Sequence, residues 1–159
     1  MDDPYPNGAE RDDAALYRAH ADELTRYATV LVGPDDAPDV VVDAVLAAFR
    51  SPGWAVVDNR RAYLYRAVFT RALSMRRSDA RRTRREMVVA TPEITVVQES
   101  SVDAHRALAQ LSAQQRAVVY LTYWDDLTPT QIAELLDVGE GTVRKQLARA
   151  REQLRRILQ

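Results

Sequence analysis

The amino-acid sequence predicts an all-α protein of two small helical domains joined by a linker, the C-terminal one a helix-turn-helix domain. Three observations support this fold class. The chain of 159 residues contains only five glycines and is dominated by residue types that suit helices. Apolar residues recur at three- and four-residue spacings over long stretches. Ser112 and Thr128 are each followed three positions later by Gln, which is the capping-box pattern of a helix start.

The first domain is expected over residues 12–85, after a disordered tail formed by residues 1–11. Gly33 and Pro34 end its first helix, because Gly favours the end of a helix and Pro cannot continue one. Each helix carries an apolar stripe that marks its buried side. The three helices are expected over residues 12–32, 37–50 and about 59–85.

Residues 86–102 are expected to form the linker between the domains. Their Val and Ile could form short strands by propensity, but a lone hairpin without a partner sheet is marginal. The second domain is expected over residues 103–159, as four short helices. The first covers residues 103–110, Ser112 caps the second, and the helix-turn-helix supplies the other two.

Residues 127–151 have the helix-turn-helix pattern. Thr128 is the expected N-cap of its first helix, and Pro129 suits the first helical position. Asp137 and Gly139 then favour a tight turn, because both tolerate a left-handed backbone. The second helix has one apolar face, formed by Val143, Leu147, Ala150, Leu154 and Ile157.

The polar residues of that second helix are the candidate DNA contacts. In a helix-turn-helix protein the first turns of this helix enter the major groove, where Arg and Gln can read base edges and Lys can hold phosphate. The alternative is an ordinary helical hairpin with a solvated basic face. The candidate residues are Thr142, Arg144, Lys145, Gln146 and Arg149.

Charge is segregated along the chain, although the formal net charge is −1. Residues 60–85 and 144–159 are strongly basic, and the stretches between and before them are acidic. Two basic blocks indicate two nucleic-acid contacts, although two solvated helices would give the same pattern. In the third helix, Tyr63, Tyr65 and Phe69 are mixed with arginines, which suits single-stranded DNA, unless these rings face the core.

Other classes of function are disfavoured. The chain has no Cys and its two histidines, His20 and His105, lie far apart, so neither a metal site nor a cofactor is expected. Asp39 and Asp43 share a helix face, but no Gly-rich loop, third acid or His stands nearby, so we expect a solvated or partner-facing edge and not an enzyme. No apolar run reaches about 18 residues and the N-terminus is acidic, so a cytoplasmic protein without a membrane span or signal peptide is expected.

Three stretches of the chain have the residue pattern of a known family. The longest reads LSAQQRAVVYLTYWDDLTPTQIAELLDVGEGTVRKQLARAREQLRRIL, and the two shorter ones read APDVVVDAVLAAF and YLYRAVFTRALSMRR. The first closely resembles the C-terminal promoter-binding domain of bacterial RNA polymerase sigma factors. The other two resemble, more weakly, the N-terminal domain of the extracytoplasmic-function group of these factors. The resemblance covers roughly residues 16–158.

The resemblance implies a sigma factor that binds core RNA polymerase and directs it to specific promoters. The helix over residues 37–50 would dock on polymerase through Asp39, Val42, Asp43 and Leu46. The third helix would melt and recognise the −10 region of promoter DNA through Tyr63, Arg66, Thr70, Arg71, Arg76 and Arg77. The second helix of the helix-turn-helix would bind the −35 region of promoter DNA. The resemblance also implies an anti-sigma protein as a further partner.

The sequence also departs from the family pattern. In the third helix, Tyr63 stands where Trp is usual, Phe69 where a basic or small residue is usual, Thr70 where Asn is common and Ser74 where Asp is common. Val42 and Gly139 replace a frequent Gln and a frequent Ser. Two alternatives stay open: a helix-turn-helix regulator that acts without polymerase, and a sigma-like interaction protein that is deficient in promoter melting.

Overall fold

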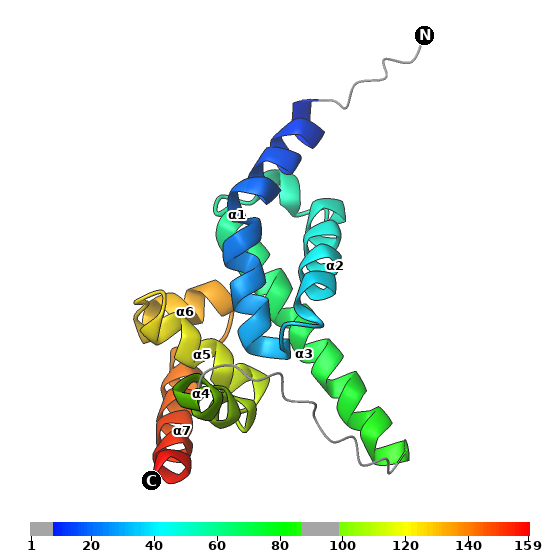
Figure 1. Ribbon diagram of the computed structural model, residues 1–159. Helices are drawn as coiled ribbons and strands as arrows, with labels where there is room; N and C mark the ends of the chain where they lie inside the picture. The colour runs from blue at the N-terminus through cyan, green and yellow to red at the C-terminus, as the bar shows by residue number, and fades with distance from the viewer. Residues whose placement is uncertain (1–7, 87–98) are drawn as a thin grey trace.

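The computed structural model describes residues 8–86 and 99–159, and every regular element in these residues is a helix (Figure 1). The all-α prediction is confirmed for this part of the chain. In chain order the elements are α1 (Gly8–Val32), α2 (Ala37–Arg50), the short 3-10 helix η1 (Trp54–Val56), α3 (Arg60–Glu86), α4 (Glu99–Ala109), α5 (Ala113–Tyr123), α6 (Pro129–Leu136) and α7 (Glu140–Leu158).

Two helix starts differ from the prediction. α1 begins at Gly8, so the last residues of the predicted tail are helical. α4 begins at Glu99, so the last residues of the predicted linker are helical as well. Proline would prevent an early helix start, but the nearest preceding prolines, Pro6 before α1 and Pro92 before α4, lie outside both helices. Both helices can therefore begin about four residues earlier than predicted. The remainder of the predicted tail and linker, residues 1–7 and 87–98, lies outside the described residues.

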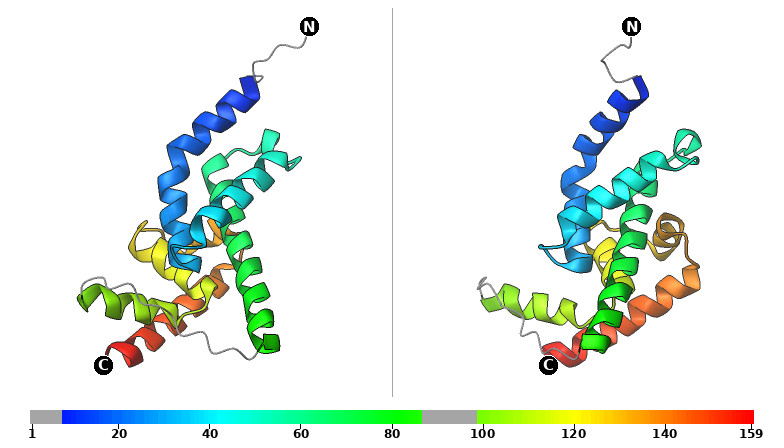
Figure 2. Two further views of the ribbon diagram at one scale, coloured as in Figure 1. Left: turned by 45° about the vertical axis from the view of Figure 1, so that its right-hand side comes forward. Right: turned by 90° about the vertical axis from the view of Figure 1, so that its right-hand side faces the viewer.

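The N-terminal half packs α1, α2 and α3 against one another (Figure 2). A tight turn joins α1 to α2, and Gly33 in this turn has a φ of 90°, a conformation that glycine adopts without a steric penalty. Trp54 in η1 is buried, and its Nε1 donates to Oδ1 of Asp13 in α1 at 2.9 Å. Most of the apolar residues predicted for these helices face the core, with Leu24, Leu31, Val41, Leu64, Val68 and Ala72 buried, but Val42 and Leu46 of α2 are exposed.

The C-terminal half has the local structure that its turn and capping residues predict. Ser112 and Thr128 both form complete capping boxes, and Thr128 Oγ1 accepts from the backbone N–H of Gln131 at 3.2 Å. Asp137 ends α6 in the left-handed conformation with a φ of 56°. Gly139 has a φ of −69° and is the N-cap of α7, so Asp137 is the left-handed residue of this turn.

The two halves pack together around one contiguous hydrophobic cluster. Tyr27 of α1 lies at their junction, with its ring centroid 4.9 Å from that of Tyr65 in α3 and 5.6 Å from that of Tyr120 in α5. Arg116 of α5 is buried, and its Nη1 donates to the carbonyl oxygen of Leu31, near the end of α1, at 3.3 Å. The helix-turn-helix domain therefore rests directly on α1 and α3, while the domain boundaries stay predictions.

A half-buried carboxylate joins α1 to α3. Glu23 accepts hydrogen bonds from Nη2 of Arg61 at 2.8 Å and from Oη of Tyr65 at 2.9 Å. It also makes a short hydrogen bond with His20. Burial by itself raises the pKa of Glu23, but the hydrogen bonds from these three side chains outweigh burial and lower the pKa to about 2. The ionised carboxylate therefore stabilises the fold.

We expect Glu23→Gln to lower the free energy of unfolding by about 1–2 kcal/mol at neutral pH. Because the pKa of Glu23 is depressed in the folded chain, its contribution is fully present above the ordinary value of 4.5 and is lost as the pH falls towards 2. Urea unfolding of both proteins over this range measures the difference. A difference that stays constant from neutral pH to pH about 3 would show that the charge of Glu23 contributes nothing to stability.

Candidate nucleic-acid and partner surfaces

α7 presents an apolar face to the core and a polar face to solvent. Val143, Leu147 and Ala150 are buried, and α7 packs on α5 and α6. The predicted contact Gln146 is half-buried, with its Nε2 3.4 Å from Oε1 of Gln114 in α5. The other four predicted contacts are exposed: Thr142, Arg144, Lys145 and Arg149.

Arg144 is held by a carboxylate at the start of α7. Its Nε and Nη2 donate to Oε1 of Glu140 at 3.1 and 2.7 Å. Oγ1 of Thr130, in the first turn of α6, donates to Oε2 of the same carboxylate at 3.0 Å. The hydrogen bond from Arg144, and after it the one from Thr130, lowers the pKa of Glu140. Sequence analysis missed Glu140, although its spacing of four residues from Arg144 is typical of such a pair.

A cleft of about 540 Å³ lies between α2 and α3. Arg71, at this cleft, is exposed, and its Nη2 lies 3.3 Å from Oδ2 of Asp43 in α2. The cleft therefore brings a residue predicted to contact −10 DNA together with one predicted to contact polymerase. Four of the residues predicted for the −10 region line it: Tyr63, Arg66, Thr70 and Arg71.

Tyr63 is the aromatic residue of α3 that lines this cleft. Its Oη donates to Oγ of Ser51 at 2.8 Å, and its ring meets that of Trp54 edge-on with the centroids 5.7 Å apart. Tyr65 and Phe69, the other two rings considered for base stacking, are buried in the core and only 1% and 4% exposed. Base stacking is therefore closed to these two rings, whereas Tyr63 is only partly buried.

Arg66 reaches from the cleft to the helix-turn-helix domain. Its Nη2 donates to the carbonyl oxygen of Glu134 at 3.1 Å, and its Nε donates to that of Leu135 at 3.3 Å. Both carbonyls are in the last turn of α6, where intrahelical donors are missing. Arg66 thus caps α6 and contributes to the contact between the two halves. Arg76 and Arg77 lie further along α3, the first half-buried and the second exposed.

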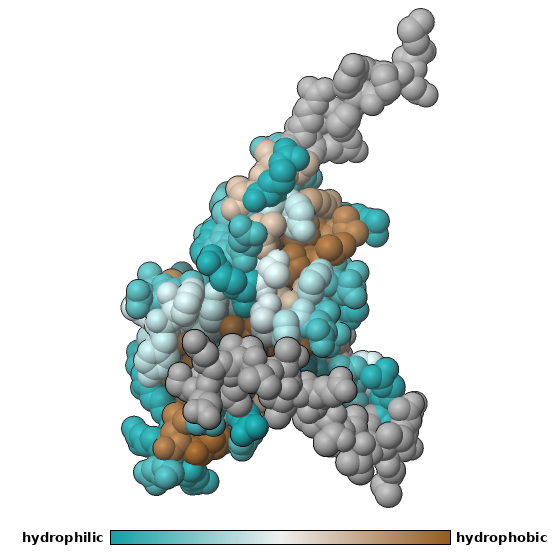
Figure 3. All heavy atoms as spheres, in the orientation of Figure 1, coloured by the Kyte–Doolittle hydropathy of each residue, from teal (hydrophilic) through white to brown (hydrophobic). Residues whose placement is uncertain are grey.

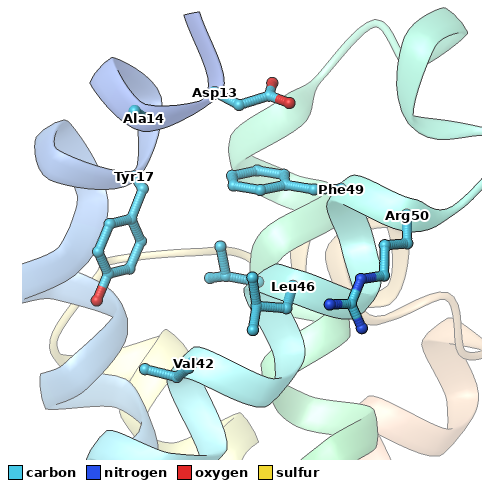
Figure 4. A pocket seen from close by; sticks show the side chains of 8 residues that line it. Asp13, Ala14, Tyr17, Val42, Leu46, Phe49 and Arg50 are labelled. Carbon is cyan, nitrogen blue, oxygen red and sulfur yellow. The ribbon is translucent and has the colours of Figure 1, made fainter. Parts of the chain in front are cut away.

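An apolar groove of about 430 Å³ lies between α1 and α2. Figure 4 shows Tyr17 of α1 facing Leu46 and Phe49 of α2 across it. Val42 and Leu46 are 45% and 44% exposed, which is unusual for large apolar side chains, and Figure 3 shows the apolar surface over α2. All four residues predicted to contact polymerase are exposed on this helix: Asp39, Val42, Asp43 and Leu46.

The described surfaces suit recognition of DNA and of a protein partner. Among the residues that the structure describes, no three His, Cys, Asp or Glu side chains gather as metal ligands would. In the same part of the chain, no helix is both long and apolar enough to cross a membrane. An exposed basic helix in a helix-turn-helix domain, combined with an open apolar groove, is typical of a DNA-binding protein that works with a partner.

Comparisons with known proteins show which kind of DNA-binding protein this chain resembles. The family model "Sigma-70, region 4" matches residues 101–154. The chain is 36% identical over 169 residues to the ECF RNA polymerase sigma factor SigL of Mycobacterium tuberculosis, covering 96% of this chain and 94% of that protein. It is 34% identical over 147 residues to the ECF RNA polymerase sigma factor SigM of the same species, covering 90% of this chain and 75% of that protein.

A solved structure has a similar fold. The sigma factor RpoE from Bartonella quintana, in complex with the anti-sigma factor NepR, matches with a TM-score of 0.73 at 22% identity, over 93% of this chain and 97% of that one. The chain belongs to the ECF RNA polymerase sigma factors. It is a transcription initiation factor that directs RNA polymerase to promoters, and the sigma-factor and helix-turn-helix predictions are confirmed.

Proposed function

We propose that this sigma factor divides promoter recognition between its two halves. α7 binds the −35 region in the major groove, α3 captures exposed bases of the −10 region, and α2 holds core RNA polymerase. The observation that supports this division best is the exposure of Arg144, Lys145 and Arg149 on α7, away from its buried face. Core RNA polymerase catalyses RNA synthesis, and the sigma factor itself catalyses no reaction. Both proteins act in the cytoplasm.

The residues of α7 would have different tasks on DNA. Arg144 and Lys145 lie near the helix start, from which side chains reach base edges. Arg149 lies about one turn further along and suits a phosphate contact. Thr142 is exposed in the first turn, whereas Gln146 must leave its contact with Gln114 before it can reach a base.

Transcription in vitro tests the proposal. Core RNA polymerase with this sigma factor should produce transcripts from genomic promoter fragments that core polymerase alone does not produce. Tight promoter binding by the isolated chain, without any transcript, would instead identify a regulator that acts without polymerase. Binding to core without a transcript, even from a pre-melted promoter, would identify an interaction protein.

We expect Tyr63→Ala to reduce transcription from a duplex promoter roughly tenfold more than from a promoter that is already melted. A base–aromatic stack is worth about 1–3 kcal/mol, and Tyr63 lines the cleft between α2 and α3. Single-round transcription from matched duplex and bubble templates measures the two effects. Tyr63→Phe is the matched control, because it keeps the ring and loses only the hydrogen bond to Ser51. Equal losses on both templates, with a lower melting temperature, would assign Tyr63 to packing.

The groove between α1 and α2 is the proposed docking surface for core RNA polymerase. It presents the exposed apolar side chains of Val42 and Leu46. The exposed acids Asp39 and Asp43 lie beside them on the same helix, α2. Exposed apolar surface with a polar rim is typical of protein-interaction sites. The similar sigma factor RpoE was solved with an anti-sigma factor, and we propose that an anti-sigma protein is also a partner of this chain.

A further inference from the structure

We propose that Glu140 determines −35 specificity by holding Arg144 in the orientation that reads a base pair. The inference rests on the proposed function of α7 and adds a positioning residue to it. Glu140 was absent from the DNA contacts expected from sequence, where an acid in the first turn of a helix is accounted for by the helix dipole alone.

Glu140 is fixed from two helices at once. One carboxylate oxygen accepts from both Nε and Nη2 of Arg144, and the other accepts from Thr130. Thr130 is in the first turn of α6 and Glu140 is in the first turn of α7. These are the ends of the two helices that a helix-turn-helix domain turns towards DNA. The carboxylate therefore ties Arg144 to both helices at the surface that faces the promoter.

The contact leaves the reading edge of Arg144 free. A guanidinium has five N–H donors in a planar fork. The pair with Glu140 uses Nε–H and one hydrogen of Nη2, so Nη1 and the second hydrogen of Nη2 remain unused by this pair. These donors form the end-on edge of the fork, and two N–H groups of an arginine can pair with O6 and N7 of guanine. Because the orientation is set before binding, less side-chain freedom is lost when Arg144 meets the base.

The same carboxylate weakens binding to DNA in general. Glu140 places a negative charge at the end of α7 that approaches the phosphates, where it repels them. A repulsive group that remains at a contact surface is a recognised way to gain specificity at the expense of affinity. Glu140 should therefore lower binding to all DNA while it sharpens the choice of base opposite Arg144.

α7 itself offers a matched control. Glu152 pairs with Nη2 of Arg156, also four residues away, nearer the C-terminal end of the helix. Removal of Glu152 changes the net charge of α7 by the same amount as removal of Glu140. It leaves Arg144 and Thr130 untouched.

The test is selection of binding sites from promoters with a randomised −35 region, by the full-length chain assembled with core RNA polymerase. Glu140→Ala should reduce base preference three- to tenfold at the position that Arg144→Ala also affects, and should raise binding to non-promoter DNA two- to threefold. The double variant should show no less preference than Arg144→Ala alone. Thr130→Val and Glu140→Gln should give intermediate losses, and Glu152→Ala should keep the preference of the unmodified chain.

Three outcomes overturn the inference. If Arg144→Ala changes the preferred base and Glu140→Ala does not, Arg144 reads without help, and the −35 function of α7 stands. If Glu152→Ala relaxes preference as much as Glu140→Ala, the effect is one of net charge. If Arg144→Ala also leaves the preference unchanged, both the inference and the proposed reading by Arg144 fail. Melting temperatures of all variants show whether a loss of preference follows from a loss of folding.

Discussion

Replacing both Val42 and Leu46 by aspartate should abolish co-purification of this sigma factor with core RNA polymerase. Both side chains are nearly half exposed in the free chain beside the groove between α1 and α2. Burying a fully exposed side chain of this kind is worth about 1.5–3 kcal/mol, so burying the nearly half that is still exposed is worth about 0.7–1.4 kcal/mol. Two of them contribute about 1.4–2.8 kcal/mol, and each 1.4 kcal/mol is about tenfold in affinity, so we expect a loss of about 10- to 100-fold from burial alone. The loss is larger still because each aspartate also places a charge in the interface.

The double variant should fold normally, because both side chains already contact water. Val56→Asp is the matched control, since Val56 is 80% exposed in η1, away from the groove, and this variant should still co-purify with core. Undiminished binding by the double variant, at unchanged helicity, would place the polymerase contact elsewhere. Asp39→Arg is a useful companion, because Asp43→Arg would also break the pair with Arg71.

The largest expected effect on stability is that of Arg116→Ala, about 2–4 kcal/mol. Arg116 donates to the carbonyl oxygens of Ala109 at 2.7 Å, Leu111 at 3.1 Å and Leu31 at 3.3 Å. A buried acceptor that loses its donor costs about 1–3 kcal/mol. Burial, and after it the charge of Arg76, lowers the pKa of Arg116 to about 10, so at neutral pH the side chain is still charged and the substitution removes a charge-assisted donor.

Thermal or urea unfolding of the free chain measures this effect. Arg156→Ala is the control, because Arg156 is exposed and pairs only within its own helix, with Glu152, and it should change stability by less than about 0.5 kcal/mol. Arg116 donates both within the helix-turn-helix domain and to the end of α1. An unchanged unfolding transition in Arg116→Ala would therefore show that neither set of contacts contributes to stability.

The parts of the fold that depend on neighbours along the chain could be predicted from sequence. The capping boxes of Ser112 and Thr128 involve residues three positions apart, and the buried face of α7 follows from spacings of three and four. These local rules predicted α5, α6 and α7 and the outward position of Arg144. The choice between Asp137 and Gly139 for the left-handed position stayed open, because both residue types tolerate that conformation.

Contacts between distant segments could not be predicted in this way. Arg66 donates to Glu134 and Leu135, separated from it by 68 and 69 positions. An arginine that binds a neighbouring helix and one that binds DNA both lie off the apolar stripe, so periodicity does not separate them. Periodicity alone did not predict the exposure of Val42 and Leu46 either, because apolar residues on a helix are assigned to the core until the neighbouring helices are known to leave them uncovered. Only the family resemblance indicated it, by placing both residues among the polymerase contacts.

The contact of Arg66 with α6 has a thermodynamic consequence for promoter capture. While Nε and Nη2 of Arg66 donate to the α6 carbonyls, only its remaining N–H groups are available to −10 DNA, so under the proposed role the two contacts compete. Separation of the halves and binding of the −10 strand are then linked equilibria, and each favours the other by the same factor. Energy transfer between labels on α2 and α7 would show this as a longer distance when a −10 oligonucleotide is added. A core polymerase that held the halves apart would then act as an allosteric activator of DNA binding as well as the catalyst.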